Sequence, residues 1–227
     1  MSLLTRIESV ERRIQAACER SGRNRDDVQV IAVTKYVSLQ ATGEAIHAGL
    51  THVGENRWQD AEAKWRAYQS EAIWHYIGSL QTNKAKDVVG KFSYIHSLDR
   101  VSLAEAIEKR ARALDTCVPC FIQVNVSGEE SKHGLSPQDV KPFLDQLKQF
   151  PHIQPIGYMT MAPYEAEPEA TRPVFRSLRQ LRDEINETLS EPIKHLSMGM
   201  SNDFEVAIEE GATWVRLGSI LVGKEGE

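Results

Sequence analysis

The sequence predicts a single (β/α)8 barrel, and three observations lead to this fold class. From residue 29 onward, apolar segments of strand length alternate with segments of helical periodicity. Eight strand segments can be recognised, which is the number that closes a parallel barrel. The chain has 227 residues, a length that suits one such domain.

The expected elements follow one another along the chain in a regular order. Strands are predicted at residues 29–36, 52–56, 73–80, 94–98, 118–126, 153–161, 194–200 and 213–222. Helices are predicted between them at residues 38–49, 57–69, 82–90, 100–114, 136–149, 170–190 and 202–211. We therefore expect one domain over residues 1–227, with its barrel at residues 29–223.

An additional helix is expected before the barrel, within an N-terminal segment of residues 1–22. Leu4, Ile7, Val10 and Ile14 recur at helical spacing over residues 3–21, and Gly22 provides a stop signal. Because this helix precedes the first strand, it is an addition to the eight-fold repeat.

An open, doubly wound sheet is the alternative fold. Such a sheet commonly carries a Gly-x-Gly-x-x-Gly turn after its first strand, but this chain has Thr34-Lys35-Tyr36-Val37-Ser38 there. The barrel is therefore favoured.

Composition excludes several classes of function. The net charge is -5 at pH 7, and an acidic surface does not attract nucleic acid or anionic membranes. The chain shows no apolar run of membrane-spanning length and no signal-peptide pattern, so a cytoplasmic location is expected. Cys18, Cys117 and Cys120 are too few for a disulfide framework and are interpreted as structural, and no metal site is implied.

Lys35 is the first candidate for chemistry. Residues 30–33 are small or β-branched and predict a strand buried on both faces, which Lys35 follows almost directly. Ligands of α/β folds bind at the carboxyl ends of parallel strands, where an amine in partly apolar surroundings can act as a nucleophile. Alternatively, Lys35 only marks the point where the strand reaches water.

The last two strand ends carry the second candidate feature. Residues 195–203 run from a strand through small residues into a helix start, whose free backbone amides suit a phosphate. In the next segment, Gly218 permits close approach of a ligand and Ser219 adds a donor. Phosphate-binding barrels commonly hold the anion after strands seven and eight. Either segment alone could be an ordinary turn, but both together favour an anion site.

Three further segments complete the analysis of the residues. An inward-facing Arg216 in strand eight would need a polar partner. The irregular stretches 127–134 and 163–173 follow strands five and six and should lie at the barrel mouth, as lids or as solvated connectors.

Motifs along nearly the whole chain resemble the pyridoxal phosphate homeostasis protein family, which is related to the barrel domain of alanine racemase. The segments that carry the resemblance are Ala32-Val33-Thr34-Lys35, Gly54-Glu55-Asn56, residues 74–84, Gly157-Tyr158-Met159-Thr160-Met161, residues 196–201 and Val215-Arg216-Leu217-Gly218-Ser219. The resemblance implies a barrel of the fold-type III class, with pyridoxal 5'-phosphate (PLP) held as a Schiff base on Lys35.

The resemblance also implies roles for the other residues of the site. Arg216 would face the pyridine nitrogen and, because a guanidinium stays protonated, would disfavour protonation of the ring. Asn56 would contact the phenolic oxygen, and His75 would either support the site or be a packed core histidine. The residues expected to bind the phosphate are Ser201, Gly218 and Ser219, with help from the Met200 backbone.

The family relationship favours a carrier over an enzyme. Alanine racemases use the lysine and a tyrosine from a second domain as two bases, and this chain ends at Glu227, just after strand eight. We therefore expect a monomer that sequesters PLP and releases it to PLP-dependent apo-enzymes. A weak amino-acid racemase is the first alternative. The second is a binder of a phosphorylated sugar or metabolite, in which Lys35 forms a different Schiff base or only neutralises charge.

Overall fold

The structure, a computed structural model, describes residues 2–128, 133–163 and 166–223. Eight parallel strands pair in chain order, and β8 pairs with β1 to close a barrel. They are β1 (Gln29–Val33), β2 (His52–Glu55), β3 (Ile73–Tyr76), β4 (Tyr94–Leu98), β5 (Val118–Gln123), β6 (Ile153–Met159), β7 (His195–Ser197) and β8 (Trp214–Leu217). The predicted barrel is confirmed.

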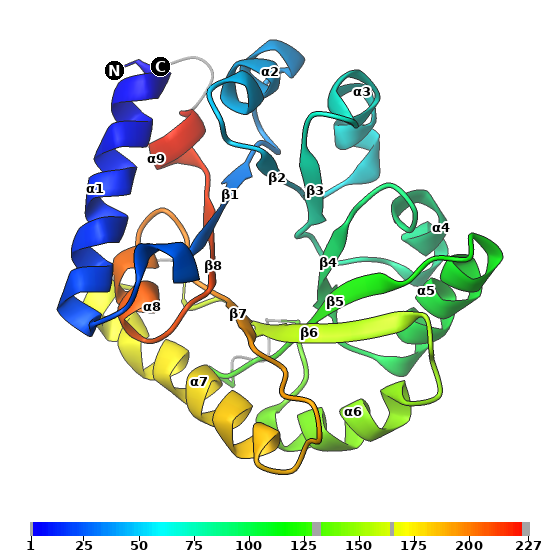
Figure 1. The fold of residues 1–227 in the computed structure, drawn as a ribbon. Coiled ribbons are helices and arrows are strands. Elements are labelled where there is room, and N and C mark those ends of the chain that lie inside the picture. The colour runs from blue at the N-terminus through cyan, green and yellow to red at the C-terminus, as the bar shows by residue number, and fades with distance from the viewer. Residues whose placement is uncertain (1, 129–132, 164–165, 224–227) are drawn as a thin grey trace.

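Helices surround the barrel as an outer ring (Figure 1). The described residues contain α1 (Leu3–Ser21), α2 (Leu39–His47), α3 (Trp58–Tyr68), α4 (Ala85–Val88), α5 (Val101–Ala113), α6 (Val140–Leu147), α7 (Arg172–Asn186), α8 (Phe204–Glu209) and α9 (Ser219–Val222). They also contain the 3-10 turns η1 (Arg25–Asp27), η2 (Thr82–Lys84), η3 (Pro137–Asp139) and η4 (Pro168–Thr171). None of these helices is long and apolar enough to cross a membrane.

The additional helix α1 is present over the predicted residues and lies along α8 and α9 (Figure 1). Its N-terminus is capped by the Ser2 hydroxyl, and it ends at Gly22, whose φ of 67° is the left-handed conformation that glycine adopts readily. Arg6 of α1 donates from Nε to the carbonyl oxygen of Leu221 over 2.8 Å. The helix is thus attached to the last turn of the chain.

Most of the predicted strands extend too far at their carboxyl ends, and the third and the eighth do so by the most residues. The strand predicted at 73–80 ends at Tyr76, and the one predicted at 213–222 ends at Leu217, after which residues 219–222 form α9. Leu221 is buried next to α1 instead of continuing the sheet. An apolar run shows that residues are buried, but it does not show against which element they pack.

The core has two parts. A large cluster of apolar side chains lies between the barrel and the helices. A smaller cluster of Ile31, Phe121, Met159 and Trp214 lies inside the barrel. Buried polar side chains also lie in the barrel interior, among them those of His75, His96 and Arg216.

The two irregular stretches begin at the carboxyl ends of β5 and β6, so the end of the barrel from which they emerge is the predicted one. Residues 129–132 and 164–165 of these stretches lie outside the described residues. A lid role therefore stays a prediction.

Candidate functional site

Lys35 lies two residues beyond the end of β1, at the carboxyl end of the barrel. Its side chain is half-buried, and its Nζ atom lies 4.8 Å from the centroid of the Tyr36 ring. Tyr36 itself is 78% exposed. The amine is therefore shielded on one side by an aromatic ring and remains accessible at the mouth.

The loops after β7 and β8 lie side by side. The backbone N–H of Gly218 donates to Ser201 Oγ over 3.2 Å, and the N–H of Arg216 donates to the carbonyl of Gly199 over 3.0 Å. Ser219 is exposed and begins α9. The structure thus brings Ser201, Gly218 and Ser219 together at one edge of the mouth.

Met200 lies in the same loop, but its backbone amide already has a partner. The N–H donates over 2.7 Å to the carboxylate of Asp203, and burial raises the pKa of that carboxyl group. Help from Met200 in binding an anion would require this hydrogen bond to open.

Arg216 points into the barrel from β8 and is 5% exposed. Its Nη1 donates to Ser197 Oγ over 2.8 Å and its Nη2 to the carbonyl of Thr160 over 3.1 Å. Burial lowers the pKa of Arg216 to about 10, so the guanidinium is still protonated at neutral pH. The polar partners that the sequence required for Arg216 are these two groups.

Asn56 follows β2 directly, at the same end of the barrel as Lys35. Its Oδ1 atom is buried and has no hydrogen-bond partner among the described residues. Gly78 packs so closely on Asn56 that a Cβ there would lie 2.3 Å from the Asn56 carbonyl oxygen. A buried amide oxygen without a partner is unusual, and this one is suited to bind a polar group of a ligand.

His75 lies inside the barrel on β3 and is fully buried. Its two ring nitrogens contact His52 Nδ1 at 3.0 Å and His96 Nε2 at 2.9 Å. His96 in turn lies 2.9 Å from Ser197 Oγ, the group that accepts from Arg216. His75 is thus connected to Arg216 through hydrogen bonds, without a direct contact to it in the described residues.

Sequence reasoning missed an ion pair beneath Lys35. Lys64 of α3 donates from Nζ to Glu55 Oε1 over 2.9 Å and to the carbonyl of Thr34 over 2.6 Å. The Thr34 hydroxyl donates to the same Glu55 oxygen over 2.7 Å. All three side chains are buried. This Glu55 clip joins the residues that immediately precede Lys35 and Asn56.

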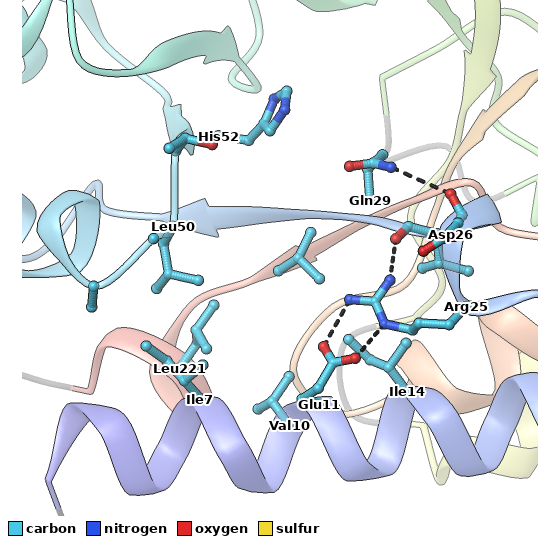
Figure 2. Close-up of a pocket in the computed structure, with 15 residues that line it drawn as sticks. Ile7, Val10, Glu11, Ile14, Arg25, Asp26, Gln29, Leu50, His52 and Leu221 are labelled. Carbon is cyan, nitrogen blue, oxygen red and sulfur yellow. Dashed lines mark hydrogen bonds and ion pairs between the residues drawn. The ribbon is translucent and has the colours of Figure 1, made fainter.

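A cavity of about 600 Å³ lies at the opposite end of the barrel, between α1 and the starts of β1 and β2 (Figure 2). None of the predicted site residues lines it. His52 does line it, and Arg25 there is paired with the Glu11 carboxylate (Figure 2).

The closed parallel barrel, with an amine after its first strand and small-residue loops after its last two, is the architecture of an alanine racemase N-terminal domain. The family model "Alanine racemase, N-terminal domain" matches residues 6–226. A pyridoxal phosphate homeostasis protein from Aquifex aeolicus is 44% identical over 225 residues, covering 99% of both chains. Another, from Pseudomonas aeruginosa, is 39% identical and covers 96% of this chain and 93% of its own. The chain belongs to the pyridoxal phosphate homeostasis protein family.

Solved structures agree with this assignment. The structure of PipY from Synechococcus elongatus PCC7942 with PLP bound is similar, with a TM-score of 0.85 and 35% identity, covering 98% of this chain and 100% of that one. An alanine racemase from Clostridium difficile 630 shares the fold, with a TM-score of 0.72 at 16% identity. The chain spans 57% of that racemase.

The Glu55 clip yields a testable prediction. Lys64→Met should lower the free energy of unfolding by about 3 to 5 kcal/mol, because it leaves the Glu55 carboxylate buried and uncompensated. Adding Glu55→Gln should recover much of this loss. Arg66→Met on the same helix removes only an exposed ion pair and should change stability by less than about 1 kcal/mol. Denaturant titration measures all four proteins, and equal effects of Lys64→Met and Arg66→Met would contradict the prediction.

Proposed function

We propose that this chain binds PLP through a covalent link to Lys35 and serves in PLP homeostasis as a carrier. The observation that carries the proposal is the PLP-bound PipY structure, which matches 98% of this chain. The barrel supports it, because its carboxyl end brings together Lys35, Asn56 and the two serine loops, which follow β7 and β8 and carry Ser201 and Ser219. Arg216 points into the same barrel from β8.

The residues present fit the cofactor in three respects. Gly218 leaves room near the backbone, since a Cβ there would meet nothing closer than Val33 at 3.7 Å. The unpaired Asn56 Oδ1 can accept a hydrogen bond from the phenolic hydroxyl. Arg216 offers a protonated guanidinium at the barrel interior for a neutral ring nitrogen.

Bound PLP supplies an aldehyde that condenses with amines and a ring that withdraws electrons from attached carbon atoms. The chain's own residues determine how far this chemistry goes. Lys35 would hold the aldehyde carbon, and the Ser201 and Ser219 hydroxyls would hold the phosphate, with the Gly218 amide available to it only if its hydrogen bond to Ser201 opens. Arg216 keeps the proton that it donates, so the ring nitrogen stays unprotonated and withdraws electrons weakly. Such a site retains PLP while limiting reaction of bound amino acids.

The role of carrier implies a recipient. We place the chain in the cytoplasm as a monomer that passes PLP to PLP-dependent apo-enzymes. The accessible position of Lys35 beside the exposed Tyr36 supports transfer, because an incoming amine can reach the mouth. The three free cysteines are consistent with a reducing compartment.

The covalent link can be tested directly. Purified protein incubated with PLP should turn yellow, and reduction with borohydride should fix the cofactor's mass on the peptide that contains Lys35. Lys35→Ala should lose both signals and remain folded, because a half-buried mouth residue adds little core packing. Lys86→Ala, an exposed lysine of α4, is the matched control and should retain both. Attachment to another lysine, or none, would refute the proposal.

The phosphate site can be tested with two forms of the vitamin. Ser201→Ala combined with Ser219→Ala should raise the dissociation constant for PLP by about 100-fold, since two hydrogen bonds to a charged group are lost. The affinity for pyridoxal, which lacks the phosphate, should not change. Equal losses for both ligands would place the phosphate elsewhere.

Carrier and enzyme can be distinguished by proton exchange. With L- or D-alanine in deuterated water, the PLP-loaded protein should leave the α-proton signal in the NMR spectrum as intense as the Lys35→Ala variant does. The physical reason is the unprotonated ring beside Arg216, which stabilises a carbanion poorly. Rapid loss of the α-proton signal with the unmodified protein alone would favour a racemase.

A further inference from the structure

A line of hydrogen-bonded side chains crosses the barrel interior, and we call it the histidine chain. His52 Nδ1 lies 3.0 Å from His75 Nε2, and His75 Nδ1 lies 2.9 Å from His96 Nε2. His96 Nδ1 lies 2.9 Å from Ser197 Oγ, which accepts from Arg216 Nη1 over 2.8 Å. The five residues come from β2, β3, β4, β7 and β8. The line runs from the cavity in Figure 2, which His52 lines, to the guanidinium.

Arg216 determines the direction of every hydrogen bond in this chain. A guanidinium only donates, so Ser197 Oγ must accept from it. Among the described residues, the other partner of Ser197 Oγ is His96 Nδ1. If Nδ1 carried a proton, the serine hydrogen would have no acceptor inside the barrel, which is costly for a buried hydroxyl. The hydroxyl of Ser197 therefore donates to His96 Nδ1.

The same logic passes along the remaining rings. A neutral imidazole has one N–H and one accepting nitrogen, so His96 carries its proton on Nε2 and donates to His75 Nδ1. His75 then donates from Nε2 to His52 Nδ1. His52 is left with its Nε2–H, which can donate to water because this side chain is half-buried and lines the cavity. All three histidines are the Nε2–H tautomer.

The rings are also held in place and kept neutral. His75 is stacked on Tyr94 at 4.6 Å between centroids, and His96 is stacked on Phe121 at 4.2 Å. Burial lowers the pKa of His75 and His96 well below the usual range, with repulsion from neighbouring groups adding to the effect, and burial also lowers the pKa of His52. In the described ranges no three His, Cys, Asp or Glu side chains gather as a metal site, so the ring nitrogens serve each other.

We propose that His52, His75, His96 and Ser197 are positioning residues for Arg216. Locked in one tautomer, the histidine chain holds the Ser197 hydroxyl as an acceptor toward the guanidinium. Thr160, through its carbonyl, holds the second nitrogen, so Arg216 is fixed without a carboxylate partner. The part of this inference that concerns the cofactor rests on the proposed function, in which Arg216 faces the ring nitrogen.

A proton relay is the competing role, and the hydrogen-bond direction argues against it. Every donor in the chain points away from Arg216, so a proton could only leave from the guanidinium toward His52. Arg216, with a pKa of about 10, keeps its proton at neutral pH. The histidine chain therefore positions Arg216 and does not conduct protons.

The first test uses protein without cofactor. Long-range ¹H–¹⁵N spectra of uniformly labelled protein at pH 7 distinguish the two neutral tautomers and the charged ring, and His75→Phe and His195→Phe help assign the signals. We expect His52, His75 and His96 as neutral Nε2–H tautomers. An Nδ1–H tautomer at His75 or His96, or a charged ring at either, would overturn the inference.

The second test interrupts the histidine chain at its middle ring, His75. His75→Phe retains a ring that can stack on Tyr94, but His96 loses its acceptor. Without cofactor, the Arg216 guanidinium protons should exchange with water about tenfold faster than in the unmodified protein, the effect of weakening one buried hydrogen bond. The dissociation constant for PLP should rise about tenfold as well. His195→Phe, which changes a half-buried histidine at the start of β7 outside the chain, should alter neither value.

The two proposals fail in different ways. If the tautomers are as expected but the unmodified protein does not bind PLP, the proposed function is wrong and the histidine chain stands. If the protein binds PLP but His75→Phe matches His195→Phe in both guanidinium exchange and affinity, the positioning role is wrong. If His75→Phe does not fold, the tautomers of the unmodified protein still decide.

Discussion

The pairing of β1 with β8 is the constraint on which the site depends. It aligns Gln29 with Trp214 and Ala32 with Leu217, so that the first and last strands end at the same height. The turn that carries Lys35 and the turn at Gly218 then become neighbours. The attachment of Arg6 to the Leu221 carbonyl holds α1 against α9, the helix that follows β8. A ligand that contacts both turns would bind only the closed barrel and would stabilise it by mass action.

Burial of a guanidinium inside this barrel explains why so much of the interior is polar. An unpaired cation in an apolar interior is strongly unfavourable, and here no carboxylate forms an ion pair with Arg216 in the described residues. Oxygen atoms from β7 and from the end of β6 take its hydrogens, and the imidazoles behind Ser197 extend the polar line. The apolar cluster of Ile31, Phe121, Met159 and Trp214 fills the space around that line. The polar groups of the barrel interior thus compensate the burial of the Arg216 guanidinium.

Chain order and hydrophobic periodicity were sufficient to predict the barrel, α1 and the end of the barrel where Lys35, Asn56 and the two serine loops lie. In a parallel barrel, all strand ends of one kind meet at one face, so these placements require no knowledge of contacts. The partners of Arg216 could not be predicted, because they depend on which side chains share a layer inside the barrel. Lys64 was missed because lysines on helices are mostly exposed, although this one lies on the face of α3 that buries Ala61 and packs Trp65 against the core. His96 did carry a signal: it is a polar residue in the middle of the buried strand β4.

Two lysines near the mouth differ in the partners of their amines. Lys64 is buried and committed to Glu55 and to the Thr34 carbonyl. Lys35 lies one residue after Thr34, yet among the described residues no carboxylate pairs with it, and its amine lies over the Tyr36 ring. Because Lys64 neutralises the Glu55 carboxylate, Glu55 does not need Lys35 as its partner. An amine that is free of a carboxylate can be desolvated and can attack a carbonyl carbon, whereas a paired one cannot do so without breaking its ion pair. The Glu55 clip thus leaves Lys35 without a carboxylate partner among the described residues.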